Sequence, residues 1–193
     1  DADGLQTCTA TATCTPGCAS GDACIAGSCT AAVGDPTVAD IGTGTGLYVS
    51  LVALPDGRLA AAYYDRVNRA LKLAVESAPN ANAFTESELH GGPTGDRGLW
   101  ASAVVDGSGT IHIAYQDAIG DQLLYLSWNG NPSTPELVDD GVRPGDRTHP
   151  VGAGAAIYLV AGAPAIAYQD GLTSDVYLAT RSAAATWSTT AIS

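Results

Sequence analysis

Three aspartates recur at one position of a repeated tetrapeptide, and acidic groups of this kind bind ligands, metal ions or arginines. The tetrapeptide reads Ala-Tyr-x-Asp and ends at Asp65, Asp117 and Asp170, so the spacing is 52 and then 53 residues. A Gly-Asp-Arg tripeptide ends at Arg97 and again at Arg147. If each aspartate closes a second strand and each arginine precedes the next first strand, these groups share one loop face.

This loop face is predicted to bind a glycan or an acidic ligand through aromatic stacking and bidentate arginine contacts. The candidate ligand-binding residues are Tyr64, Asp65, Arg97, Trp100, Gln116, Asp117, Arg147, Gln169 and Asp170. The alternative is a structural role, in which each arginine pairs with a repeated aspartate and each aspartate caps its own turn. Recurrence favours the structural role, because catalytic residues are normally unique within a chain.

Motifs for metal binding and catalysis are few. The acidic loops at Asp139-Asp140 and Gly120-Asp121 offer oxygen ligands for calcium, but no EF-hand pattern is present. We expect no cofactor, with calcium as the one candidate ion. The only histidines are His90, His112 and His149, and no Gly-x-Ser-x-Gly elbow is present, so no catalytic residue is predicted and an enzyme is the less favoured interpretation.

The elements that position these residues are predicted to be β-strands in three repeats, at 46–97, 98–148 and 149–193. In the second repeat, short β-branched, aromatic or small segments alternate with Gly-rich and Asp-rich turns. The four strands expected there are 99–105, 110–116, 122–128 and 136–139. Four antiparallel strands in about 50 residues are typical of a β-propeller blade, so the fold class is all-β.

The repeats resemble bacterial β-propeller repeats of the sialidase-like, Asp-box-related kind. The resemblance rests on Ala-Tyr-x-Asp and on the acidic, Gly-rich turn from Asp106 to Thr110, and it covers about 36–193. It implies propeller-type blades. A sialidase site would also need an arginine cluster and a tyrosine nucleophile. Arg97 and Arg147 are two candidates, whereas the first repeat has Thr45 in the matching place.

Three blades are too few for a closed propeller, which has about four to eight. The segment 36–41 resembles the fourth strand of a preceding blade. We therefore expect a homo-oligomer, a second chain, or further blades of a longer precursor to complete the ring. The propeller-like domain is predicted to span 35–193.

A cysteine-rich leader is predicted over 1–34. It contains all five cysteines, which are Cys8, Cys14, Cys18, Cys24 and Cys29. A short Thr-, Ala- and Gly-rich segment has little core of its own, so disulfides are expected to stabilise it in an oxidising compartment. The odd number leaves one cysteine for a partner outside the segment. The chain is thus expected to be secreted, extracellular or at the cell surface, with the periplasm as an alternative, and to have been processed.

The formal net charge of −12, with Lys72 as the only lysine, argues against nucleic acid as a partner. No apolar run approaches the length of about 18–20 residues that spans a membrane. The favoured function is a non-catalytic binding or assembly protein that contacts a glycan or a surface protein through the loop face. The alternatives are a fragment of a sialidase-like glycoside hydrolase and a structural subunit of an extracellular assembly.

Overall fold

The computed structural model describes residues 22–25, 28–31, 45–92 and 94–192. The chain divides into two compact units, Asp1–Gly42 and Thr43–Ser193. The predicted strand at 36–41 lies outside the described residues. No helix capable of crossing a membrane is found in the described part of the chain.

The first unit contains one described hairpin, formed by β1 (Asp22–Ile25) and β2 (Ser28–Ala31). Its antiparallel register places Cys24 directly opposite Cys29. Cys8, Cys14 and Cys18 lie outside the described residues, so the disulfides of the leader stay a prediction.

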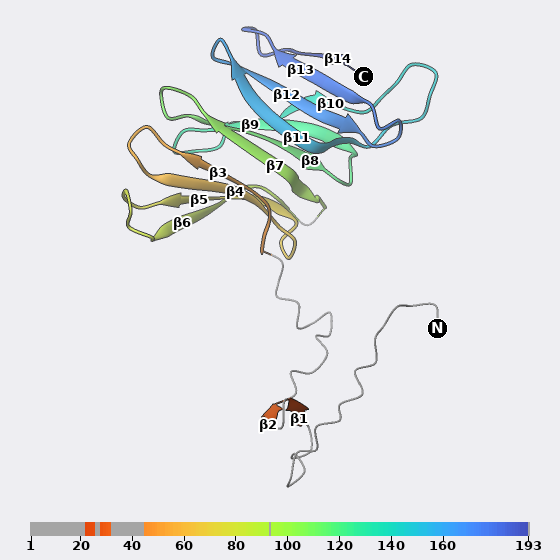
Figure 1. Ribbon diagram of the computed structural model, residues 1–193. Helices are drawn as coiled ribbons and strands as arrows, with labels where there is room; N and C mark the ends of the chain where they lie inside the picture. The colour runs from red at the N-terminus through yellow and green to blue at the C-terminus, as the bar shows by residue number, and fades with distance from the viewer. Residues whose placement is uncertain (1–21, 26–27, 32–44, 93, 193) are drawn as a thin grey trace, which may run out of the picture. The chain divides into compact units, whose positions relative to one another are not determined.

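The second unit consists of three four-stranded antiparallel sheets, each built from four strands that are consecutive in the sequence (Figure 1). The strands of the first sheet are β3 (Thr45–Ala53), β4 (Leu59–Asp65), β5 (Ala70–Glu76) and β6 (Phe84–His90). Those of the second sheet are β7 (Arg97–Val105), β8 (Ile111–Asp117), β9 (Gln122–Trp128) and β10 (Glu136–Asp139). Those of the third sheet are β11 (Val151–Val160), β12 (Ala163–Asp170), β13 (Val176–Arg181) and β14 (Trp187–Ala191). The described residues contain strands and no helix, which confirms the all-β prediction.

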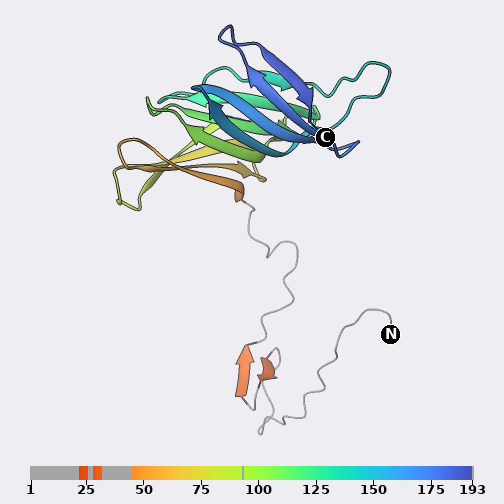
Figure 2. The ribbon, with the colours of Figure 1, turned by 45° about the horizontal axis from the view of Figure 1, so that its top comes forward.

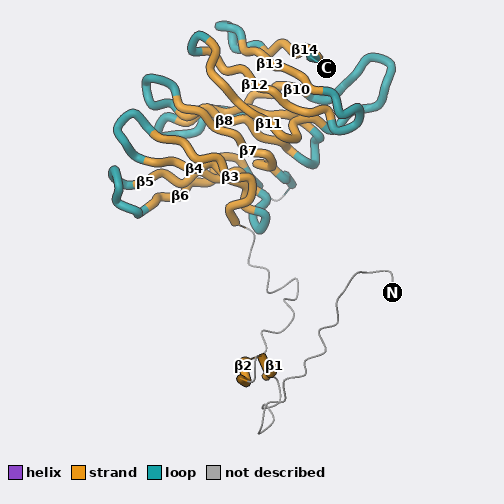
Figure 3. The backbone as a smooth tube through the Cα atoms, viewed as in Figure 1, coloured by secondary structure: helices purple, strands orange, loops and turns teal. Residues whose placement is uncertain are grey.

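The three sheets lie face against face as successive propeller-type blades, with the second sheet between the other two (Figures 2 and 3). Their first strands, β3, β7 and β11, are neighbours. Two serine hydroxyls join them: the Ser50 Oγ accepts the Ala103 N–H at 2.9 Å, and the Ser102 Oγ accepts the Ile157 N–H at 3.1 Å. The same contact therefore recurs at both junctions between sheets.

Hydrogen bonds within the turn fix where the chain reverses direction between the first two strands of a sheet. In the second sheet the Asp106 carboxylate accepts the backbone N–H groups of Ser108 and Thr110, both at 2.9 Å. Gly109 completes this turn at a φ of 88°, a left-handed conformation that glycine adopts without a steric penalty. The acidic, Gly-rich turn recognised in the sequence is thus the hairpin between β7 and β8.

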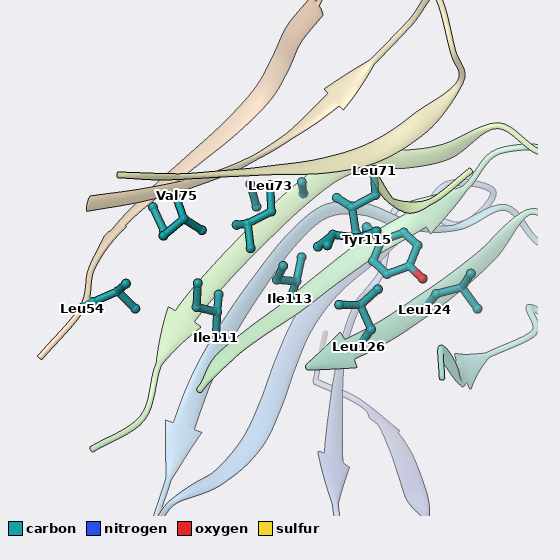
Figure 4. Close-up of a cluster of buried hydrophobic side chains, with 13 residues drawn as sticks. Leu54, Leu71, Leu73, Val75, Ile111, Ile113, Tyr115, Leu124 and Leu126 are labelled. Carbon is teal, nitrogen blue, oxygen red and sulfur yellow. The ribbon is translucent and has the colours of Figure 1, made fainter. Parts of the chain in front are cut away.

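Two apolar clusters fill the junctions between sheets. Ile111, Ile113 and Tyr115 of β8 meet side chains of the first sheet, among them Leu71 and Leu73, as Figure 4 shows. The alternate face of the second sheet contributes to a second cluster with the third sheet. Because side chains alternate across a strand, the second sheet is buried on both faces.

Replacing Ile113 with alanine is expected to lower the free energy of unfolding by about 2–5 kcal/mol, because the fully buried side chain leaves a cavity when it is shortened. Urea unfolding measures this. Val142→Ala, at an exposed loop position, is the control and should change stability by less than about 0.5 kcal/mol. Equally small effects for both variants would contradict a packed junction between the first two sheets.

Candidate functional site

The three repeated aspartates end the second strand of each sheet, and all three are buried. One carboxylate oxygen of each accepts two backbone N–H groups from the loop that follows, at 2.9 to 3.2 Å. The donors are Val67 and Asn68 for Asp65, Ile119 and Gly120 for Asp117, and Leu172 and Thr173 for Asp170. Each aspartate therefore caps its own turn, as the structural alternative predicted.

A cationic side chain meets the second oxygen of each buried carboxylate. In the first sheet Lys72 Nζ lies 2.8 Å from Asp65 Oδ2, and in the second sheet Arg97 Nε lies 2.9 Å from Asp117 Oδ2. Burial raises the pKa of Asp65, but Lys72 and the N–H donors outweigh it, so the pKa falls to about 2. The Arg97 Nη1 also donates to the Gly91 carbonyl at 3.1 Å, so this arginine is held within the framework.

The third sheet uses histidine for the same purpose. His149 Nδ1 lies 2.6 Å from Asp170 Oδ2, and its Nε2 lies 3.3 Å from Asp146. Arg143 lies 3.5 Å from Asp170 and 2.9 Å from the buried Asp139. The hydrogen bond to Asp170 raises the pKa of His149. Burial raises the pKa of Asp170, but His149 and the N–H donors of its turn bring it below the usual value.

The repeated Gly-Asp-Arg tripeptide predicted equivalent places for Arg97 and Arg147, and the structure shows that their places differ. Strand register pairs Arg97 with Asp117, Thr45 with Asp65, and Val151 with Asp170. The connection between the second and third sheets, 140–150, is longer than that between the first two, 91–96, so the third copy is shifted in sequence. Arg147 is exposed and lies outside the strand, and His149 occupies the site expected for its side chain.

Two aromatic side chains, Tyr48 and Trp100, meet across neighbouring first strands with ring centroids 4.6 Å apart. We call this pair the aromatic platform. Their exposed fractions are 37% and 39%. The Tyr64 ring lies 6.2 Å from Tyr48, and its hydroxyl donates to Asp96 at 2.5 Å. Burial and the Asp96 carboxylate raise the pKa of Tyr64, which stays a neutral donor.

The backbone beneath the aromatic platform is strained. Tyr48 has a φ of 52° and Trp100 a φ of 55°, in the left-handed region that bulky residues rarely adopt. Each lies within the second of two shifts of strand register, in a bulged segment that redirects its side chain. The third sheet has Gly154 at this place, with a φ of 61°. Left-handed backbone at a non-glycine residue costs on the order of 1–3 kcal/mol and tends to persist at functional positions.

The two glutamines of the predicted site have different surroundings. Gln116 is buried and its Nε2 donates to the Val151 carbonyl at 2.9 Å, so it joins the second sheet to the third. Gln169 holds the same register position in the third sheet and is exposed.

Among the predicted residues the structure thus separates two groups. Asp65, Asp117, Asp170, Arg97 and Gln116 have framework contacts. Trp100 forms the aromatic platform with Tyr48, which was not among the predicted site residues, and the buried Tyr64 lies beside Tyr48. The signal for Tyr48 was its alignment with Trp100 in the repeat.

The described residues contain no group of three or more His, Cys, Asp or Glu side chains arranged to hold a metal ion. Asp139, in one of the two candidate calcium loops, instead accepts hydrogen bonds from Arg143 and from the Tyr168 hydroxyl. His90 and His112 lie 2.7 and 2.6 Å from tyrosine hydroxyls. His90 therefore contacts a tyrosine of the neighbouring sheet, and His112 contacts a tyrosine of its own sheet.

Comparison with known proteins finds likeness to solved structures at low sequence identity. No family model and no curated protein matches the chain. A solved structure described as NanB plus Optactamide matches with a TM-score of 0.49 at 16% identity, over 71% of this chain and 22% of that one. The chain therefore spans about a fifth of the length of that structure.

Removing the two arginines separately should distinguish their roles. Arg97→Ala is expected to destabilise the fold by about 1–3 kcal/mol, because it leaves the buried Asp117 carboxylate without its cation. Arg147→Ala, at an exposed position, should change stability by less than about 0.5 kcal/mol. Thermal or urea unfolding gives both values, and a larger loss for Arg147→Ala would refute the assignment.

The His149 and Asp170 pair predicts a defined pH dependence. A raised folded-state pKa means that the His149 contribution is complete below its ordinary pKa of 6.5 and is lost as pH rises through the raised value. The Asp170 contribution is complete above its ordinary pKa of 3.8 and is lost as pH falls through the lowered value. The pair therefore stabilises the fold most between these two ordinary values.

Urea midpoints of the parent and of His149→Gln, measured from pH 5 to pH 9, test this dependence. The difference between the two proteins should shrink as pH rises, because His149 loses its proton while Asp170, Asp146 and Arg143 are the same in both. A difference that stays constant over this range would contradict the predicted contribution of His149 titration to stability.

Proposed function

We propose that this chain is a non-catalytic, glycan-binding module of a secreted or cell-surface protein. The observation that carries the proposal is the aromatic platform, in which Tyr48 and Trp100 are exposed on a strained backbone. Large, rigid aromatic rings provide contact area at a low cost in conformational entropy, and the apolar face of a sugar ring packs well on them.

The surroundings of the aromatic platform favour a neutral sugar. Asp96 is half-buried near the platform, and one of its carboxylate oxygens accepts a hydrogen bond from the Tyr64 hydroxyl. The Asp96 carboxylate therefore provides a polar group at the edge of the rings. The chain has a net charge of −12, which repels polyanions. Arg97, one of the two arginines predicted to receive an acidic ligand, is engaged by Asp117, and the other, Arg147, lies outside the strand. A neutral oligosaccharide therefore fits better than an acidic one.

The charges of the loop face support binding rather than catalysis. Glycoside hydrolysis uses two carboxyl groups that can reach the substrate and exchange a proton or form a bond. Asp65, Asp117 and Asp170 are buried, and each is held by N–H donors and a cation. A fragment of a sialidase-like hydrolase is the alternative, in which the remaining groups would come from blades beyond these three.

Export is proposed from the cysteine-rich leader. Five cysteines within the first 29 residues and none in the rest of the chain are the pattern of a short segment stabilised by disulfides. Thiol titration of the secreted protein, with and without reductant, would count the cysteines that are bonded. Five free thiols would remove this support.

Trp100→Gly should separate binding from stability. Glycine relieves the left-handed strain, and this gain offsets the lost contact with Tyr48, so stability should change by less than about 1 kcal/mol. Affinity for neutral oligosaccharides found on a glycan array should fall by about tenfold or more, because a central aromatic contact is removed. Isothermal titration calorimetry measures the loss.

Phe84→Ala is the matched control, because it removes an exposed aromatic side chain from β6, far along the sheet from the aromatic platform. It should leave affinity unchanged. Equal binding by the parent and Trp100→Gly would contradict the proposal. Turnover of fluorogenic glycosides by the parent would instead identify the hydrolase alternative.

A further inference from the structure

The outward surfaces of β3 in the first sheet and of β11 in the third sheet are apolar and exposed. On the first sheet, Val49 and Leu51 are 58% and 63% exposed, and they alternate with Ser50 and Val52, which face the second sheet. We call this surface, with Leu59, the leading face. On the third sheet, 76% of Tyr158 is exposed.

Tyr158 and the exposed Val160 alternate with the buried Ile157, which packs toward the second sheet. We call the surface of Tyr158 and Val160 the trailing face. At each internal junction, the side of one sheet that corresponds to the trailing face packs against the side of the next sheet that corresponds to the leading face. At the internal junctions a neighbouring sheet covers the equivalent side chains. Among the described residues, no sheet covers either of these two faces.

The two internal junctions share a backbone hydrogen bond on the loop face. The Arg97 N–H donates to the Arg69 carbonyl, and the Val151 N–H donates to the Asp121 carbonyl, each at 3.1 Å. Arg69 and Asp121 both have left-handed backbone, with φ of 52° and 53°. The third sheet keeps this geometry at the same position, four residues after the repeated aspartate, where Ser174 is exposed and has a φ of 66°.

A side-chain contact follows the same pattern. The residue before the repeated aspartate reaches the start of the next sheet: Tyr64 binds Asp96, and Gln116 binds the Val151 carbonyl. The third sheet has Gln169 at this position, exposed to solvent. The trailing face therefore presents two groups that join sheets elsewhere, the Ser174 carbonyl and the Gln169 amide.

We propose that a second copy of this chain covers both faces, with the trailing face of each copy against the leading face of the other. Thr45 pairs with the repeated aspartate of its sheet, as Arg97 and Val151 do in theirs. The Thr45 N–H of one copy donates to the Ser174 carbonyl of the other, and the Gln169 amide donates to the Thr45 carbonyl. Two such interfaces, related by a two-fold axis, close one ring.

The number of sheets supports a second copy as the occupant. Closed propellers contain about four to eight blades, and two copies of three sheets are the only multiple of this unit in that range. The composition of the two faces also supports a second copy as the occupant. The trailing face has Ala156 where the internal junctions have Ser50 and Ser102, so a hydroxyl contact gives way to apolar packing against Leu51. Interfaces between identical chains are more apolar than other protein interfaces.

Sedimentation equilibrium and native mass spectrometry in the presence of reductant test the proposal without any contribution from the cysteines of the leader. The parent is expected to have twice the chain mass of 19.4 kDa over a wide range of concentration. Leu51→Asp on the leading face and Tyr158→Asp on the trailing face should each weaken dimerisation at least a hundredfold, since each places a carboxylate in both copies of the interface. Ile119→Asp, at the exposed tip of the middle sheet, is the matched control and should remain dimeric.

Both variants are needed, because an interface between two leading faces would be disrupted by Leu51→Asp alone. A dimer that survives Tyr158→Asp would therefore overturn the head-to-tail arrangement. A monomeric parent would overturn the second copy as occupant and assign the faces to other blades or another protein. A mass that keeps growing with concentration would overturn ring closure.

Discussion

A four-stranded sheet that is apolar on both faces excludes water only when another sheet lies against each of them, and the other features of this unit depend on that requirement. The second sheet meets it, with Ile113 turned toward one neighbour and Ala114 toward the other. Stacking sheets face to face also brings their first strands side by side. The aromatic platform exists because β3 and β7 are neighbours, since Tyr48 and Trp100 come from different sheets.

The same stacking buries the charges at the end of each second strand. A buried carboxylate is costly unless hydrogen bonds and a cation compensate it, and each sheet solves this problem with a different residue. Lys72, Arg97 and His149 come from three different places in their repeats, yet each reaches the repeated aspartate of its own sheet. What the three sheets share is a positive charge beside the aspartate rather than a residue type at one sequence position. The aspartates therefore belong to the framework, and the proposed binding surface is the aromatic platform.

The sequence predicted what local chemistry determines. Strand alternation and the turn at Asp106 depend on neighbouring residues, so the strands of the second repeat were placed to within about two residues of their observed bounds. The partner of Asp170 was not predictable, because the long connection 140–150 brings His149 rather than Arg147 to that carboxylate. The backbone of Trp100 was not predictable either. A left-handed tryptophan results from a bulge held by the packing of neighbouring sheets, and no local propensity favours it.

The comparison between Trp100 and Gly154 separates what folding needs from what the surface provides. Both residues hold the same left-handed place in the bulge of a first strand, and glycine holds it without strain. The fold alone therefore does not need an aromatic side chain there. Closing two copies into a ring would place two aromatic platforms on one loop face, and such a pair binds a branched or repeated ligand with an effective concentration set by their fixed separation. In such a ring, weak stacking at each platform would suffice for stable attachment, and the proposed binding would then give the strain at Tyr48 and Trp100 a functional reason.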